Sequence, residues 1–137
     1  MTAQFSEVLF YKGQRVAMCS CPLNAFLRLS GFSKYFRRNC SALWRGYVGT
    51  WEIVNDRLYL IEVKGEFVDG SPCNLEAIFP GYPDRVFAHW YSGTLRIPQG
   101  KLLKNVHMRF GSVYESDLHI EIQKGIVLNL YQEINNV

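Results

Sequence analysis

The chain has 137 residues, of which 48% are hydrophobic and 15% aromatic. This length predicts one domain with a substantial core, and the composition excludes a disordered polypeptide. The net charge is a mild +3, but the segment between Glu7 and Glu52 contains no acidic residue. Its basic residues are Lys12, Arg15, Arg28, Lys34, Arg37, Arg38 and Arg45. They either balance the acidic remainder of the chain, which we favour, or mark an anionic partner.

The predicted elements begin with a hairpin and a helix. Residues Glu7 to Tyr11 form a strand, Lys12 to Gln14 turn, and Arg15 to Cys19 return as a second strand. A helix follows from Pro22, because proline suits the first helical turn. It ends at Gly31, because glycine readily adopts the left-handed conformation found after a helix.

The clearest hairpin signal in the chain lies between Ala42 and Val63. Asn55 and Asp56 both tolerate a positive φ angle, so they can form the two central residues of a type I′ turn. This turn places Trp51 opposite Leu60, with both side chains on the buried face near the turn.

The same register places Val48 opposite Val63 further from the turn. Val48 and Trp51 lie on opposite faces of a regular strand, because side chains alternate with a period of two. We therefore expect the buried face of the first strand to change near Gly49, where a bend or bulge is easily formed.

The middle of the chain predicts a short helix and a second long hairpin. Asn74 can cap a helical turn over Leu75 to Phe79. Residues Val86 to Ile97 then form a long strand. Pro98 to Gly100 make the turn, and Lys101 to His107 form the returning strand.

The last part of the chain predicts one more hairpin. Asp117 to Gln123 alternates, with Leu118, Ile120 and Ile122 inward and Asp117, His119 and Glu121 outward. Lys124 and Gly125 turn the chain into a strand from Ile126 to Tyr131, and the tail from Gln132 to Val137 frays. The fold class is therefore α+β and mostly antiparallel β, in a single domain over residues 1–137. We expect a curled sheet, partial barrel or sandwich with one or two short helices.

No metal site or cofactor is expected. Cys19 and Cys21 share one face of a strand, but strong zinc signals use C-x₂₋₄-C pairs, and Cys40 and Cys73 are single and scattered. The N-terminal residues lack the pattern of a signal peptide, and no apolar run is long enough to span a membrane. We therefore expect a cytoplasmic protein with reduced thiols.

Sequence motifs for catalysis are missing, since the chain contains no G-x-S-x-G, P-loop or G-x-G-x-x-G motif. Glu52 and His89 each neighbour a tryptophan on a predicted long strand. If those strands are adjacent, the two side chains can line a cleft and form a dispersed enzyme site. Structural hydrogen bonding is the role we favour for them, because acid–base chemistry demands short distances.

Several short motifs run through most of the chain. They are Tyr11-Lys12-Gly13, Pro22-Leu23, Gly46 to Ile53, Leu58-Tyr59-Leu60, Phe79-Pro80, Val86-Phe87-Ala88, Trp90 and Ser92-Gly93. In this combination the chain resembles a family of small bacterial proteins of unknown function. The resemblance implies a bacterial, cytosolic, single-domain protein, and it assigns no catalytic residue.

The remaining signal for function is the irregular, basic and aromatic segment before the central hairpin. Aromatic residues and arginine are enriched at binding hot spots, and loops on a rigid β scaffold commonly carry binding. We predict stoichiometric recognition of another protein, as by an immunity or adaptor protein. The alternative is binding of single-stranded nucleic acid or another polyanion by residues 28–47. The predicted binding residues are Lys34, Tyr35, Phe36, Arg37, Arg38 and Arg45.

Overall fold

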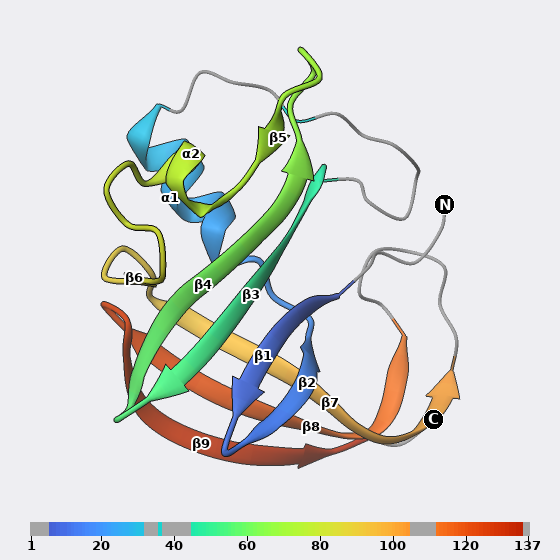
Figure 1. Ribbon diagram of the computed structural model, residues 1–137. Helices are drawn as coiled ribbons and strands as arrows, with labels where there is room; N and C mark the ends of the chain where they lie inside the picture. The colour runs from blue at the N-terminus through green and yellow to red at the C-terminus, as the bar shows by residue number, and fades with distance from the viewer. Residues whose placement is uncertain (1–5, 32–35, 37–44, 105–111, 136–137) are drawn as a thin grey trace.

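The computed structural model describes residues 6–31, 36, 45–104 and 112–135 (Figure 1). The elements are β1 (Glu7–Tyr11), β2 (Gln14–Met18), α1 (Pro22–Ser30), β3 (Tyr47–Val54), β4 (Arg57–Glu66), β5 (Pro72–Cys73), α2 (Leu75–Ile78), β6 (Val86–Phe87), β7 (Gly93–Lys104), β8 (Val113–Gln123) and β9 (Ile126–Ile134). Neither of the described helices has the length and apolar character needed to cross a membrane.

The strands form one mixed sheet in the order β2-β1-β3-β4-β9-β8-β7. The pair β1 and β3 is parallel, whereas the other strand pairs are antiparallel, and β5 and β6 add to β4 beside this path. The predicted α+β class with a curled, mainly antiparallel sheet is confirmed.

The sheet curls until the segment after β2 reaches β7. The backbone N–H of Cys19 donates to the carbonyl oxygen of Arg96 at 2.8 Å. The Ser20 hydroxyl oxygen accepts a hydrogen bond from the Arg96 N–H at 3.1 Å. These contacts hold the two ends of the strand path together on one side of the molecule.

The core fills the inside of this curl. Fully buried side chains from several strands meet there, including Leu9, Trp51, Leu60, Leu95 and Ile120. Helices α1 and α2 lie together at one end of the sheet (Figure 1). They are joined by an aromatic cluster in which the ring centroids of Phe26 and Phe79 are 4.4 Å apart and those of Phe26 and Trp90 are 5.0 Å apart.

The local turn and cap predictions are confirmed. Asn55 and Asp56 have φ angles of 51° and 60°, as a type I′ turn requires. Gly31 follows α1 with a φ of 65°, and the Asn74 side chain accepts a hydrogen bond from the Ala77 N–H at the start of α2. The pairing of Trp51 with Leu60 is also confirmed.

The register further from this turn was wrong. A β-bulge shifts the pairing by one residue, so Thr50 lies opposite Glu62 and Gly49 lies opposite Val63. The buried face of β3 consequently does not change, because Tyr47, Gly49 and Trp51 are all buried. The buried face changes on β4 instead, where Leu58, Leu60 and Val63 are buried. β4 has one more residue than β3 across the bulge, so the alternation of its side chains shifts there.

The second predicted long hairpin was also wrong. The Val86–Ile97 segment is divided between β6 and β7, because the chain turns after Phe87 and the Tyr91 N–H donates to the Ala88 carbonyl oxygen at 3.1 Å. Pro98 to Gly100 do not end the strand. Gly100, with a φ of 81°, lies where the register of β7 with β8 shifts, so it forms a bulge within β7.

The returning strand predicted over Lys101 to His107 was wrong as well, because Lys101 to Lys104 continue β7. Residues 105–107 of that prediction lie outside the described residues. The predicted fraying after Tyr131 was wrong in the same way, since β9 continues to Ile134. Residues 136–137 lie outside the described part.

Two hairpins of the structure share a Lys-Gly turn, and they allow a matched test of packing at the turn. Gly13 and Gly125 have φ angles of 76° and 82°, so an alanine at either position is strained. A Cβ at Gly125 would also lie 2.7 Å from the Ala88 carbonyl oxygen, whereas a Cβ at Gly13 would meet nothing within 4 Å.

We expect Gly125→Ala to lower the free energy of unfolding by about 3 kcal/mol and Gly13→Ala by about 1 kcal/mol, because only the first adds a steric clash to the backbone strain. Urea denaturation of the two variants and the wild type measures both values. Equal losses would contradict the packing of the β8–β9 turn against residues 87 and 88.

Candidate functional site

The structure describes two of the six predicted binding residues, Phe36 and Arg45. Lys34, Tyr35, Arg37 and Arg38 lie outside the described residues. The Phe36 ring is half-buried and packs against Tyr47 and Phe67, with centroid distances of 5.1 and 5.2 Å. This described ring therefore packs against the core.

Arg45 lies inside the protein, where it is paired with Glu7. Its Nη2 is 2.7 Å from the Glu7 Oε2, and the two side chains are 7% and 0% exposed. Glu7 also accepts hydrogen bonds from the Gly49 N–H at 2.7 Å and the Trp51 indole N–H at 3.2 Å. The Arg45 charge is thus balanced within the fold.

The Glu7 network fixes several residues of β3. A Cβ at Gly49 would lie 2.6 Å from the Glu7 Oε1, so the close approach of this carboxylate requires glycine. The Tyr47 hydroxyl donates to the Asn24 Oδ1 and thereby ties β3 to α1. Burial raises the pKa of Glu7 above its ordinary value, while the Arg45 cation and the hydrogen bonds from Gly49, Arg45 and Trp51 act in the opposite direction.

Removing the Glu7 charge alone is expected to destabilise the fold strongly. Glu7→Gln leaves the Arg45 guanidinium buried without a counter-charge, so we expect the free energy of unfolding to fall by about 3–5 kcal/mol. The double variant Glu7→Gln/Arg45→Met removes both charges and is expected to recover part of that loss. Urea denaturation gives both values, and a loss below about 1 kcal/mol for Glu7→Gln would contradict a buried ion pair.

The two residues of the dispersed enzyme site are not joined in the structure. Glu52 lies on β3 opposite Tyr59. His89 is exposed and its ring meets the edge of Trp90 at a centroid distance of 5.6 Å. In the described part of the chain, no hydrogen bond or ion pair connects Glu52 with His89. The described contacts therefore give no support to acid–base catalysis by Glu52 and His89.

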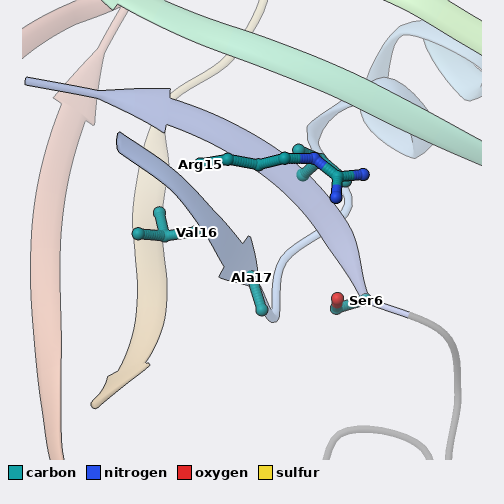
Figure 2. A pocket seen from close by; sticks show the side chains of 5 residues that line it. Ser6, Arg15, Val16 and Ala17 are labelled. Atoms are coloured by element: carbon teal, nitrogen blue, oxygen red, sulfur yellow. The ribbon is translucent and has the colours of Figure 1, made fainter. Parts of the chain in front are cut away.

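Two pockets lie at other places on the described surface. One, of about 200 Å³, is lined by Phe26, Phe79, Tyr82, Val86, Phe87 and His89. The other, of about 180 Å³, is lined by Ser6, Val8, Arg15, Val16 and Ala17. Figure 2 shows the Arg15 side chain of β2 extending across β1 at this second pocket. The Arg15 guanidinium is the one charged group among the residues that line it.

In the described part of the chain, Cys19 and Cys21 belong to no group of three side chains that could ligate a metal. Burial raises the pKa of both thiols, to about 12 for Cys21.

The largest exposed apolar side chains of the sheet are gathered on β9 and the end of β7. We call this set the β9 surface, and it comprises Leu102, Leu103, Ile126, Leu128, Leu130, Tyr131 and Ile134. Leu128 is 60% exposed and Ile134 is 68% exposed. Leu130 and Ile134 lie on one face of the strand and Tyr131 on the other, because they pair with Ile120, Ser116 and His119 of β8. Single exposed apolar residues are ordinary, but several along one strand make it a candidate interaction site.

The outer edge of β9 is largely unpaired. Its pairing with β4 is limited to Arg57 and Ile126, next to a hydrogen bond from the Val127 N–H to the Asp56 carbonyl oxygen at 2.8 Å. Figure 1 shows β4 and β9 meeting at this point and then diverging. In the described ranges, residues from Leu128 onward have β8 as their strand partner and none on the other edge.

The β9 surface was not predicted from the sequence, although four of its members, Ile126, Leu128, Leu130 and Tyr131, lie in the strand that was predicted. The strand reads IVLNLYQEI and includes one charged residue, Glu133. A run of apolar residues without regular alternation is typical of a strand buried on both faces. Here the same pattern occurs on a strand whose residues are mostly exposed, and that combination identifies the surface.

Comparison of the chain with protein-family models, curated proteins and solved structures found no match. The resemblance to a family of small bacterial proteins therefore stays a prediction.

Proposed function

We propose that this chain acts by binding another protein, which adds an extended segment to the free edge of β9. The observation that carries the proposal is the combination on β9 of exposed apolar side chains with an outer edge that is mostly unpaired among the described residues. Backbone N–H and C=O groups along such an edge can pair with an incoming strand. The side-chain surface beside it supplies specificity.

β9 has few of the features that usually protect an edge strand, although its register with β8 shifts by one residue at Leu128. Protected edges commonly contain lysine, proline or inward-pointing charges, or they are very short. β9 has nine residues, contains no lysine or proline, and has Glu133 as its only charged residue. Its large apolar side chains gain free energy when a partner covers them.

The charge around β9 indicates the composition of the partner segment. Positions 112–135 contain four acidic residues and one basic residue. They are Glu115, Asp117, Glu121, Glu133 and Lys124. A segment in which apolar residues alternate with basic ones therefore complements this part of the sheet.

The proposal keeps the function predicted from the sequence, stoichiometric recognition of a protein, but moves it to a different surface. Phe36 and Arg45, the described members of the predicted segment, pack in the interior. Nucleic acid is the poorer ligand for the β9 surface, because the surrounding carboxylates repel phosphates. No observation in the described residues favours that alternative.

The test is a matched pair of exposed leucines. Leu128 on β9 and Leu29 on α1 are 60% and 76% exposed, so a lysine at either position leaves the core intact. We expect wild type and Leu29→Lys to retain one stoichiometric partner in affinity purification from the native cell with quantitative mass spectrometry. Leu128→Lys and Ile134→Lys are expected to reduce its recovery at least tenfold, because they place a charge in the apolar contact.

Recovery of the partner at equal levels with all four proteins would contradict the proposed surface. Light scattering of the purified protein distinguishes a foreign partner from self-association of this chain. A stable dimer that Leu128→Lys dissociates would show that the strand added to β9 comes from a second copy of this chain, and that result would overturn a foreign partner.

A further inference from the structure

A polar cluster lies on β8 and β9. Asp117 and His119 are two positions apart on β8 and so share one face of the strand. Glu133 of β9 lies directly opposite Asp117, and Tyr131 lies opposite His119. Leu130 and Ile134 pair with Ile120 and Ser116 and so lie on the other face. The cluster and the apolar side chains at these two positions therefore occupy opposite faces of the same strands.

The cluster brings together three side chains of the kinds that ligate metal ions. One ligand atom from each of Asp117, His119 and Glu133 lies within 4.8 Å of the others. The His119 Nε2 is 3.6 Å from the Glu133 Oε1, which is too long for a hydrogen bond. Two ligands about 2.1 Å from one ion at a tetrahedral angle lie roughly 3.4 Å apart, close to this separation.

His119 supplies a second, independent observation. Its side chain is 16% exposed, and its Nε2 is buried without a hydrogen-bond partner. A buried polar atom without a partner costs free energy, so its presence in a native structure requires an explanation. A metal ion bound to this nitrogen would explain why the atom has no hydrogen-bond partner.

The surrounding residues hold the ligands in place. Asp117 accepts a hydrogen bond from the Arg96 Nε at 3.0 Å on Oδ1 and from the Asn135 Nδ2 at 3.0 Å on Oδ2. The Tyr131 ring stacks on the His119 ring, with centroids 4.9 Å apart and an interplanar angle of 22°. Such partners orient ligating side chains at metal sites. The carboxylates of Asp117 and Glu133 together carry more negative charge than the Arg96 cation balances, and this excess attracts a dication.

We propose that Asp117, His119 and Glu133 bind a first-row divalent transition metal of the zinc type. Imidazole and carboxylate together suit these ions, whereas Mg²⁺ and Ca²⁺ prefer oxygen ligands alone. Three protein ligands leave a coordination position open to water or to another ligand. A metal site at these residues is not predicted from the sequence, because the cysteines have no zinc spacing and His119 falls on the predicted solvent face of a strand.

The test uses Zn²⁺ alone as the probe, added to chelator-treated protein and followed by isothermal titration calorimetry. We expect saturable binding of one equivalent by the wild type and a higher melting temperature in its presence. His119→Ala and Glu133→Gln are expected to weaken binding at least tenfold. Glu133 is 62% exposed, so Glu133→Gln tests the site without disturbing the fold.

Two controls complete the experiment. Glu121→Gln removes a carboxylate from the next outward position of β8, and His89→Ala removes a histidine remote in sequence from the cluster; both are expected to bind Zn²⁺ as the wild type does. Mg²⁺ titrated in the same way is expected to give no saturable binding. The proposal is overturned if the wild type shows no saturable Zn²⁺ binding, or if His119→Ala and Glu133→Gln bind as tightly as the controls.

Discussion

The buried ion pair between Glu7 and Arg45 is the constraint on which the arrangement of the sheet depends. It joins the start of β1 to the residues before β3, and the same carboxylate accepts hydrogen bonds from Gly49 and Trp51. A buried carboxylate is tolerated only when such partners compensate for lost hydration. With β1 held in parallel register on β3, the β1–β2 hairpin extends far enough for the Cys19 N–H to reach β7. The first and last strands of the sheet order, β2 and β7, are therefore held close to each other.

The other side of the curl stays open because β4 shares one edge among three partners. β4 pairs with β9 at Arg57, with β6 at Tyr59 and Leu60, and with β5 at Gly65 and Glu66. Each of these pairings involves only one or two residues of β4, so β9 diverges from β4 after its first residues. In the described part of the chain, the rest of its outer edge has no strand partner. The β9 surface is thus a consequence of how the whole sheet is paired. The same β8–β9 ladder also brings Asp117, His119 and Glu133 together, so both candidate sites lie on this hairpin.

Local structure was predictable from the sequence, and long-range pairing was not. The turn at Asn55-Asp56, the cap at Asn74 and the end of α1 at Gly31 each depend on a few neighbouring residues, and all three are confirmed. The bulge opposite Thr50 and the break after Phe87 depend on the pairing of β4 with more than one strand, which leaves no mark in a local pattern. For the same reason Arg45, which resembles a surface charge in the sequence, proves to be the partner of a glutamate 38 positions away. Asp117 and His119 share one face of β8, as the predicted alternation requires, but Asp117 is buried where an exposed position was predicted. Their meeting with Glu133 depends on the register of β9.

Amide hydrogen exchange on the isolated protein tests the free edge of β9 most directly. Residue-by-residue exchange measured by NMR is expected to alternate between Leu128 and Ile134. Amides bonded to β8 exchange slowly, and the intervening amides, which point toward the unpaired edge, exchange much faster. Slow exchange at every position along this stretch would contradict the account, because it would show that the outer edge of β9 already has a strand partner.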